Sequence, residues 1–260
     1  MAPDEQTTTT PGPGADTAGA TTAGAGVPDD VRVNAIHHLA ASTADMKHVL
    51  EFYTRVLGME LRGLFWLHGV PGGFHAFLHL NDRSTMSFVF LPAMADIEEQ
   101  LGVTHARTGA DTTAPGTMQH LAFGVDDAEQ LLAMRDRIRS NGYRVMGPLS
   151  HGFCESIYFR GPEGAVLEVS YFRTPIDGDR WIDPEVVAAC GISPDELATM
   201  RTPPPFAGAG GTVANPAPDP SKPDLRNSPE VQAFLDSMTD EELYQRLSFD
   251  EPPVPDPNGG

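Results

Sequence analysis

The sequence predicts an α+β fold built from two copies of a β-α-β-β-β module. The main reason is an internal repeat: His-Leu-Ala at 38–40 recurs as His-Leu-Ala at 120–122, an offset of 82 residues. Asp45 recurs as Asp127 at the same offset. A helix pattern follows in each copy, and strand-like apolar runs come after the helix. Because a repeat defines the architecture, the two modules should pair to form one curved mixed sheet around a cleft.

The first copy begins with a strand over 36–40 and continues with an amphipathic helix. The helix carries apolar residues at one-face spacing: Met46, Val49, Leu50, Tyr53 and Leu57. It should end at Gly58, since glycine suits the left-handed conformation that closes a helix. Two strand-like runs follow at 74–80 and 85–91.

The second copy begins with a strand over 118–122 and a helix that should end at Gly142. The apolar positions of this helix are Leu131, Leu132, Met134 and Ile138. Three strand-like runs then follow, at 143–149, 156–161 and 165–172.

The chain divides into three regions. Residues 1–30 are rich in Thr, Ala, Gly and Pro, and we expect them to be disordered because they bury too little apolar surface. The body spans 31–173, with modules at about 31–100 and 115–173. Residues 174–260 form an acidic C-terminal extension.

The extension contains a Pro/Gly-rich linker at 202–224 and a tail at 251–260. Three helices should begin after Ser193, Ser228 and Thr239, where capping residues precede proline or acidic residues. The last two resemble a docking appendage that packs on the body or on a second copy, with a dedicated partner site as the alternative.

The composition excludes several classes of protein. The net charge is −19, although residues 31–173 are nearly balanced, with 15 acidic and 12 basic residues. This acidity argues against nucleic acid as a partner. The two cysteines exclude a disulfide framework and a Cys-rich zinc site. No stretch is apolar for long enough to cross a membrane, and no secretory signal is evident, so we expect a cytoplasmic protein.

Three residues could form a metal site. Strand alternation places His38 and His120 at equivalent positions, and Glu168 lies in the last strand opposite an apolar face. If the repeats pair side by side, these side chains converge. Two imidazoles and one carboxylate make the facial triad of non-haem iron chemistry, which suits Fe2+ or Mn2+, with zinc as an alternative. The competing interpretation is structural, because nine histidines offer many chance combinations.

The chain resembles the vicinal oxygen chelate superfamily, which includes glyoxalase I, bleomycin-resistance proteins and type I extradiol dioxygenases. The resemblance covers 35–173 and is carried by IHHLAASTADMKHVLEFYTRVLGMEL (36–61), MQHLAFGVDDAEQL (118–131) and SHGFCESIYFRGPEGAVLEVSYF (150–172). The last segment is most similar to the catechol 2,3-dioxygenase-like branch, whose pattern it matches at His151-Gly152, Ser156-Ile157-Tyr158, Pro162-Glu163-Gly164 and Glu168.

The resemblance implies a role for each matching residue. His38, His120 and Glu168 would be the metal ligands, His151 an acid or base beside the metal, and Tyr158 a hydrogen-bond donor to the substrate. The chain departs from the branch at three places: Ser150 and Gly161 stand where acids are usual, and Phe153-Cys154 replaces a smaller pair.

The activity implied is that of an Fe2+-dependent extradiol dioxygenase, which cleaves a catechol-like aromatic substrate with O2. One alternative is a glyoxalase-type isomerase or lyase, which is disfavoured because the run 86–90 offers no carboxylate as a fourth ligand. The other is a metal-free binding module of the resistance type. Residues 62–76, together with His75 and His79, should line the cleft. Because one chain already holds both modules, a homo-oligomer would be a further level of assembly beyond their pairing.

Overall fold

The computed structural model describes residues 31–206 and 213–254. The disorder expected for 1–30, part of the linker and the end of the tail therefore lie outside the described residues. Contacts divide the chain into two units. One comprises Met1–Val33 and Pro194–Arg226, and the other comprises Asn34–Ser193 and Asn227–Gly260. The second unit contains both modules.

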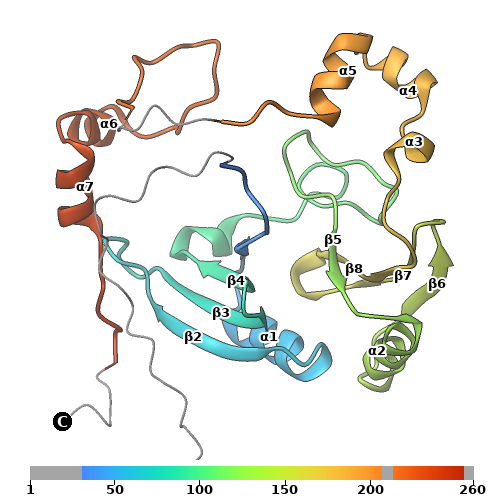
Figure 1. Ribbon diagram of the computed structural model, residues 1–260. Coiled ribbons are helices and arrows are strands. Elements are labelled where there is room, and N and C mark those ends of the chain that lie inside the picture. The colour runs from blue at the N-terminus through green and yellow to red at the C-terminus, as the bar shows by residue number, and fades with distance from the viewer. Residues whose placement is uncertain (1–30, 207–212, 255–260) are drawn as a thin grey trace, which may run out of the picture. The chain divides into compact units, whose positions relative to one another are not determined.

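The first module has the β-α-β-β-β order (Figure 1). Its elements are β1 (His38–Ser42), α1 (Met46–Glu51), the π-helical turn η1 (Phe52–Val56), β2 (Glu60–Trp66), β3 (Phe74–Asn81) and β4 (Ser84–Phe90). The strand order is β1-β4-β3-β2, with β1 parallel to β4 and the other pairs antiparallel. The sequence pattern did not identify β2, and it predicted one continuous helix where α1 gives way to η1.

The second module repeats this order. Its elements are β5 (Leu121–Gly124), α2 (Ala128–Ser140), β6 (Val145–Ser150), β7 (Cys154–Arg160) and β8 (Val166–Phe172). The strand order is β5-β8-β7-β6, which matches the first module strand for strand. The predicted α+β class with two β-α-β-β-β modules is confirmed, although the described strands form two four-stranded sheets.

Local signals explain why both helices begin where they do. The Asp45 carboxylate accepts from the His48 amide at 3.0 Å, and the Asp127 carboxylate accepts from the Gln130 amide at 2.9 Å. Each carboxylate satisfies an amide that has no partner within the helix. The repeated aspartate of the sequence is therefore a repeated helix cap.

The remaining helices are short. They are η2 (Pro92–Asp96), η3 (Pro162–Gly164), α3 (Gly178–Trp181), α4 (Pro184–Ala189), α5 (Pro194–Arg201), α6 (Pro229–Asp236) and α7 (Asp240–Leu247). The three helices of the extension that the sequence predicted are α5, α6 and α7, and Thr239 forms a complete capping box with Glu242. Across 31–206 and 213–254, no helix is long and apolar enough to span a membrane.

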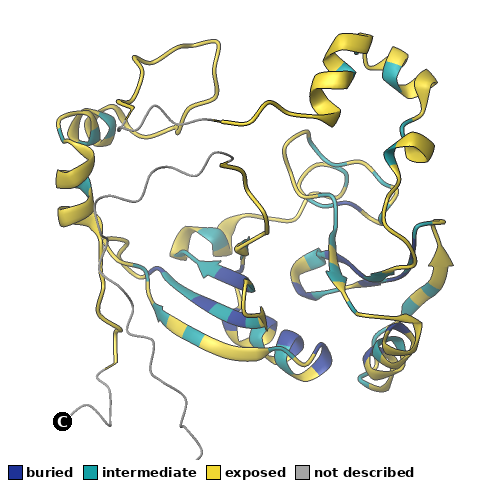
Figure 2. Cartoon of the chain, in the orientation of Figure 1, coloured by how far each residue is buried: buried dark blue, intermediate teal, exposed yellow. Residues whose placement is uncertain are grey.

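The two modules share one hydrophobic core. The Phe52 ring lies 4.9 Å from that of Tyr143 and 6.5 Å from that of Phe159, measured between centroids. Tyr53 contacts Phe88 of the first sheet and Phe123 of the second. Buried residues accordingly occur on the helices and sheets of both modules (Figure 2). The modules therefore pair through the faces of their sheets that carry the helices.

A turn of the second module also holds the start of α1. The Glu163 carboxylate accepts from the backbone amides of Ala44 at 2.6 Å and Asp45 at 3.1 Å. Glu163 has φ 50°, the left-handed conformation that non-glycine residues rarely adopt. The turn therefore joins the two modules.

Candidate functional site

Strand alternation divides each sheet into a core face and an outward face. Leu39 and Ala41 of β1 pack against the shared core, while His38 points to the opposite face. In β8, Leu167 and Val169 belong to the core, and Glu168 lies on the opposite face between them. His38 and Glu168 are therefore on the outward faces of two different sheets.

His120 and Glu168 form the centre of the site on the second sheet. His120 Nε2 lies 3.0 Å from Glu168 Oε2. Glu168 is only 6% exposed, so its carboxylate needs a partner that offsets the loss of water. The imidazole of His120 is that partner.

Gln119 determines which nitrogen of His120 faces the carboxylate. Its side-chain nitrogen donates to the carbonyl oxygens of Thr108 at 3.1 Å and Asp111 at 3.0 Å. These bonds set the orientation of the amide, so that its oxygen faces His120 Nδ1 in a short contact. The oxygen can only accept, so Nδ1 carries a proton, and Nε2 is the ring nitrogen that faces Glu168.

His120 Nε2 and Glu168 Oε2 face each other, and a cation between these two atoms makes the arrangement favourable. A proton meets this need, and so does a divalent metal ion. Two ligand atoms about 2.1 Å from a metal and at right angles to each other lie about 3.0 Å apart. The observed 3.0 Å separation fits that spacing. The pair thus fits two of the three protein ligands that the sequence predicted.

Tyr158 and His151 lie beside this pair. Tyr158 pairs with Glu168 across β7 and β8, and its hydroxyl lies 3.0 Å from His151 Nε2. Its ring lies 6.3 Å from that of His120. Burial, followed by the negative charge of Glu168, raises the pKa of the Tyr158 hydroxyl. Tyr158 therefore remains a hydrogen-bond donor at neutral pH.

The outward face of the first sheet carries aromatic rings around His38. Four residues form this aromatic face: His38, Phe65, His75 and Phe77. The His38 ring lies 5.9 Å from Phe77, which stacks on Phe65 at the same distance, and Phe65 lies 4.3 Å from His75. Burial and the nearby His68 and His38 lower the pKa of His75, so its ring is neutral at pH 7.

Two further features belong to this part of the first sheet. Thr85, the neighbour of His38 across β1 and β4, has a buried hydroxyl without a hydrogen-bond partner among the described residues. His37 Nδ1 lies 2.9 Å from His38 Nδ1. The segment 62–76, which was expected to line a cleft, contributes Phe65 and His75 to the aromatic face.

The structure does not bring His38 to His120 and Glu168 within one chain. Across 31–206 and 213–254, no three His, Cys, Asp or Glu side chains are close enough to hold a metal ion. The expected convergence assumed side-by-side pairing into one curved sheet. The modules pair instead through the core face of each sheet, which leaves the two outward faces separate.

Gln119 is the residue of this site that sequence reasoning missed. Strand alternation placed it on the face opposite His120, which would separate the two side chains. The described strand β5 begins only at Leu121, so alternation does not apply to 119–120. The sequence offered one sign of its role: Gln119 directly precedes His120, a candidate metal ligand.

Several solved structures are similar to this chain. One is the glyoxylase/bleomycin resistance protein/dioxygenase domain from Frankia sp. EAN1pec, with 14% identity, 55% of this chain and 100% of that chain covered, and a TM-score of 0.43. Another is a lactoylglutathione lyase from Agrobacterium tumefaciens, with 22% identity, 57% and 97% covered, and a TM-score of 0.37. A third is TnmS3, an antibiotic binding protein from Streptomyces sp. CB03234, with 17% identity, 55% and 98% covered, and a TM-score of 0.39.

No match to the chain was found among curated proteins. The family model of the Glyoxalase/Bleomycin resistance protein/Dioxygenase superfamily matches residues 35–169. That range begins just before β1 and ends within β8, so it contains both modules. The chain therefore belongs to the Glyoxalase/Bleomycin resistance protein/Dioxygenase superfamily.

Proposed function

We propose that the protein is a metal-dependent extradiol dioxygenase that cleaves a catechol-like substrate with O2. The observation that carries this proposal is the environment of His120, whose two ring nitrogens both face acceptor oxygens. An imidazole held in this way directs Nε2 toward a metal ion, with Glu168 as the second ligand. Fe2+ suits these ligands, and Mn2+ is the nearest alternative.

The third ligand, His38, comes in this proposal from a second copy of the chain. The aromatic face and the His120–Glu168 pair both lie away from the core. A two-fold dimer that places these faces against each other would form two equivalent sites, since each contact then occurs twice. Within such a site Fe2+ would supply the positions at which the substrate and O2 meet.

The remaining residues supply proton transfer and orientation. Tyr158 stays protonated and donates a hydrogen bond to a substrate oxygen. His151, linked to the Tyr158 hydroxyl at 3.0 Å, accepts the proton of a substrate hydroxyl and later returns it. Phe65 and Phe77 offer ring faces against which an aromatic substrate can pack.

The absence of a fourth ligand favours this reaction over the glyoxalase type. The run 86–90, within β4 of the first sheet, contains no carboxylate. A site with three protein ligands leaves more metal positions for substrate and O2 than a four-ligand site does.

The decisive experiment measures metal content by mass spectrometry after anaerobic purification, together with O2 consumption on addition of simple catechols. We expect about one iron per chain and consumption that depends on the catechol. Zinc or nickel without O2 consumption would replace this proposal with a glyoxalase-type isomerase or lyase. Failure to bind any metal after reconstitution would indicate a binding protein of the resistance type.

A further inference from the structure

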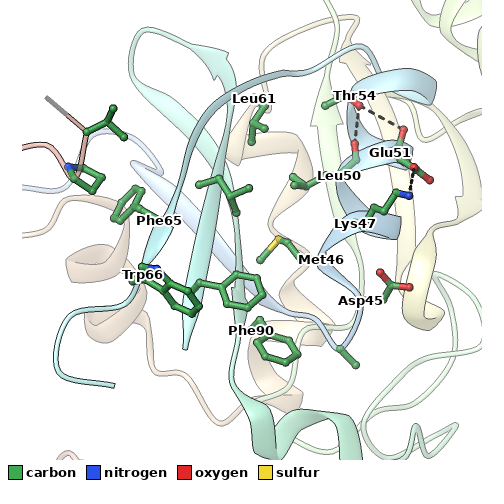
Figure 3. Close-up of a pocket in the computed structure, with 15 residues that line it drawn as sticks. Asp45, Met46, Lys47, Leu50, Glu51, Thr54, Leu61, Phe65, Trp66 and Phe90 are labelled. Atoms are coloured by element: carbon green, nitrogen blue, oxygen red, sulfur yellow. Dashed lines mark hydrogen bonds and ion pairs between the residues drawn. The ribbon is translucent and has the colours of Figure 1, made fainter. Parts of the chain in front are cut away.

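A large cavity is lined by none of the candidate metal ligands. It is an apolar groove of about 1000 Å³ on the helix side of the first sheet (Figure 3). Its apolar walls come from α1 and the strands β2, β3 and β4: Met46, Leu50, Leu61, Leu64, Phe65, Trp66, Phe74 and Phe90. We call this the aromatic groove.

The walls of the groove are only partly covered with the end of the chain in place. Trp66 is 68% exposed and Leu64 is 53% exposed, and both lie on β2, the edge strand of the sheet. Phe249 and Val254 of the covering segment are themselves 61% and 71% exposed. Trp66 meets Phe74 edge to face at 5.7 Å, and Phe74 stacks on Phe90 at 4.7 Å. Apolar surface on an edge strand favours association unless something covers it.

The end of the chain reaches this groove. Pro253 and Val254 are part of its lining. Upstream of them, Phe249 stacks on His68 at 3.8 Å between ring centroids, with the ring planes 10° apart. His68 lies in the connection between β2 and β3, two strands that contribute walls of the groove. Two separate contacts therefore join the segment 249–254 to the first module.

The chemistry of the segment suits an aromatic groove. Its sequence is Phe-Asp-Glu-Pro-Pro-Val, and it follows α7 directly. Proline restricts the backbone before docking, so little conformational entropy is lost. Grooves lined by aromatic side chains bind Pro-rich segments for this reason.

We propose that residues 249–254 dock into the aromatic groove of their own chain, with Phe249 on His68 as one anchor and Pro253-Val254 as the other. The end of the C-terminal extension would then cover part of the apolar edge of the first sheet. This role involves none of the candidate metal ligands, although the groove shares Phe65 with the aromatic face.

Trp66 provides a direct test, because the chain has two tryptophans and Trp181→Phe leaves Trp66 as the reporter. In that background, fluorescence emission and acrylamide quenching are compared between the full chain and a chain that ends at Leu247. We expect the shortened chain to show a red-shifted emission and a larger quenching constant. A synthetic peptide of residues 248–260 should reverse both changes in a saturable manner.

A point variant covers the case in which shortening disturbs folding. Phe249→Ala/Val254→Asp should reproduce the red shift, and Phe206→Ala/Val213→Asp, which changes the same residue types in the exposed linker, should not. An equal quenching constant for the full chain and for the Phe249→Ala/Val254→Asp variant would overturn the proposal. Quenching that falls as protein concentration rises would also overturn it, since the occupant would then be a second copy.

Discussion

Gln119, His120 and Glu168 illustrate how one residue sets the chemistry of its neighbour. Gln119 is held by two backbone carbonyls, so its oxygen must face His120 Nδ1. The consequence is that Nε2 is the ring nitrogen that faces the buried carboxylate. In the proposed site, Gln119 would thereby position a metal ligand without contacting the metal itself.

Replacing Gln119 with methionine should release this constraint. In the metal-free Gln119→Met variant, we expect His120 to shift toward the tautomer with the proton on Nε2, which can donate to Glu168. Metal affinity should fall by about 10–100-fold, as for other residues that orient a ligand. Nitrogen chemical shifts of the histidine ring report the tautomer, and metal titration reports the affinity.

Gln130→Met is the matched control, because Gln130 lies on α2 and its side chain bonds only near its own helix. An unchanged tautomer in Gln119→Met would show that Glu168 alone determines the state of His120.

Tyr53 connects a single side chain to the pH dependence of stability. It is 2% exposed, and burial, followed by the charge of Glu163, raises the pKa of its hydroxyl well above the ordinary value of 10.0. Above pH 10.0 the unfolded chain loses this proton while the folded chain keeps it. The free energy of unfolding therefore decreases as the pH rises, by up to about 1.4 kcal/mol per pH unit.

Tyr53→Phe should remove this part of the alkaline loss of stability. Urea unfolding at a series of pH values from 8 to 11 measures it, and Tyr244→Phe, at an exposed tyrosine, provides the comparison. Parallel pH profiles for the wild type and Tyr53→Phe would contradict the assignment.

Among the elements, the turn around η3 has a role that its sequence does not reveal. Its Glu163 accepts two backbone amides at the start of α1, in the other module. The unusual φ of 50° places the side chain in that position. The turn therefore acts as a helix cap supplied across the module boundary.

Shortening this side chain should weaken the link between the modules. Asn tolerates the left-handed conformation but does not reach α1, so Glu163→Asn should lower the free energy of unfolding by about 1 kcal/mol. Glu163→Gln keeps an acceptor oxygen at the same reach and should lose less. Urea unfolding of the three proteins at pH 7 tests this order, and equal losses for Asn and Gln would argue against the cap.

At the level of the whole molecule, the separation of His38 from His120 and Glu168 leads to a prediction about assembly. Mixing His38→Ala with Glu168→Gln should restore metal binding if one chain supplies His38 and another supplies His120 and Glu168. In a mixed dimer one of the two sites is then intact. An equimolar mixture refolded together should recover up to about a quarter of the wild-type metal content.

Each variant refolded alone is the control, and metal analysis after gel filtration gives the content per dimer. A mixture that binds no more than the average of its two components would place the complete site within one chain. Size-exclusion chromatography with light scattering tests independently whether the wild type is a dimer.

Local patterns in the sequence predicted a large part of this structure. The apolar spacing predicted the helix of each module, and the period of two along the strands assigned His38 and Glu168 to the faces opposite Leu39 and Leu167. These properties depend only on neighbouring residues. The strand β2 was missed because its apolar and polar residues do not alternate regularly, and its pairing with β3 contains a register shift.

The sequence by itself determined two modules, the helix in each, and the outward direction of His38 and Glu168, since these follow from backbone geometry within a few residues. Only the tertiary structure decided that the modules join through η1 and the core faces of their sheets. That choice depends on the total apolar surface that distant residues bury together. It separates His38 from His120 within one chain, and it brings residues 249–254 beside the aromatic groove.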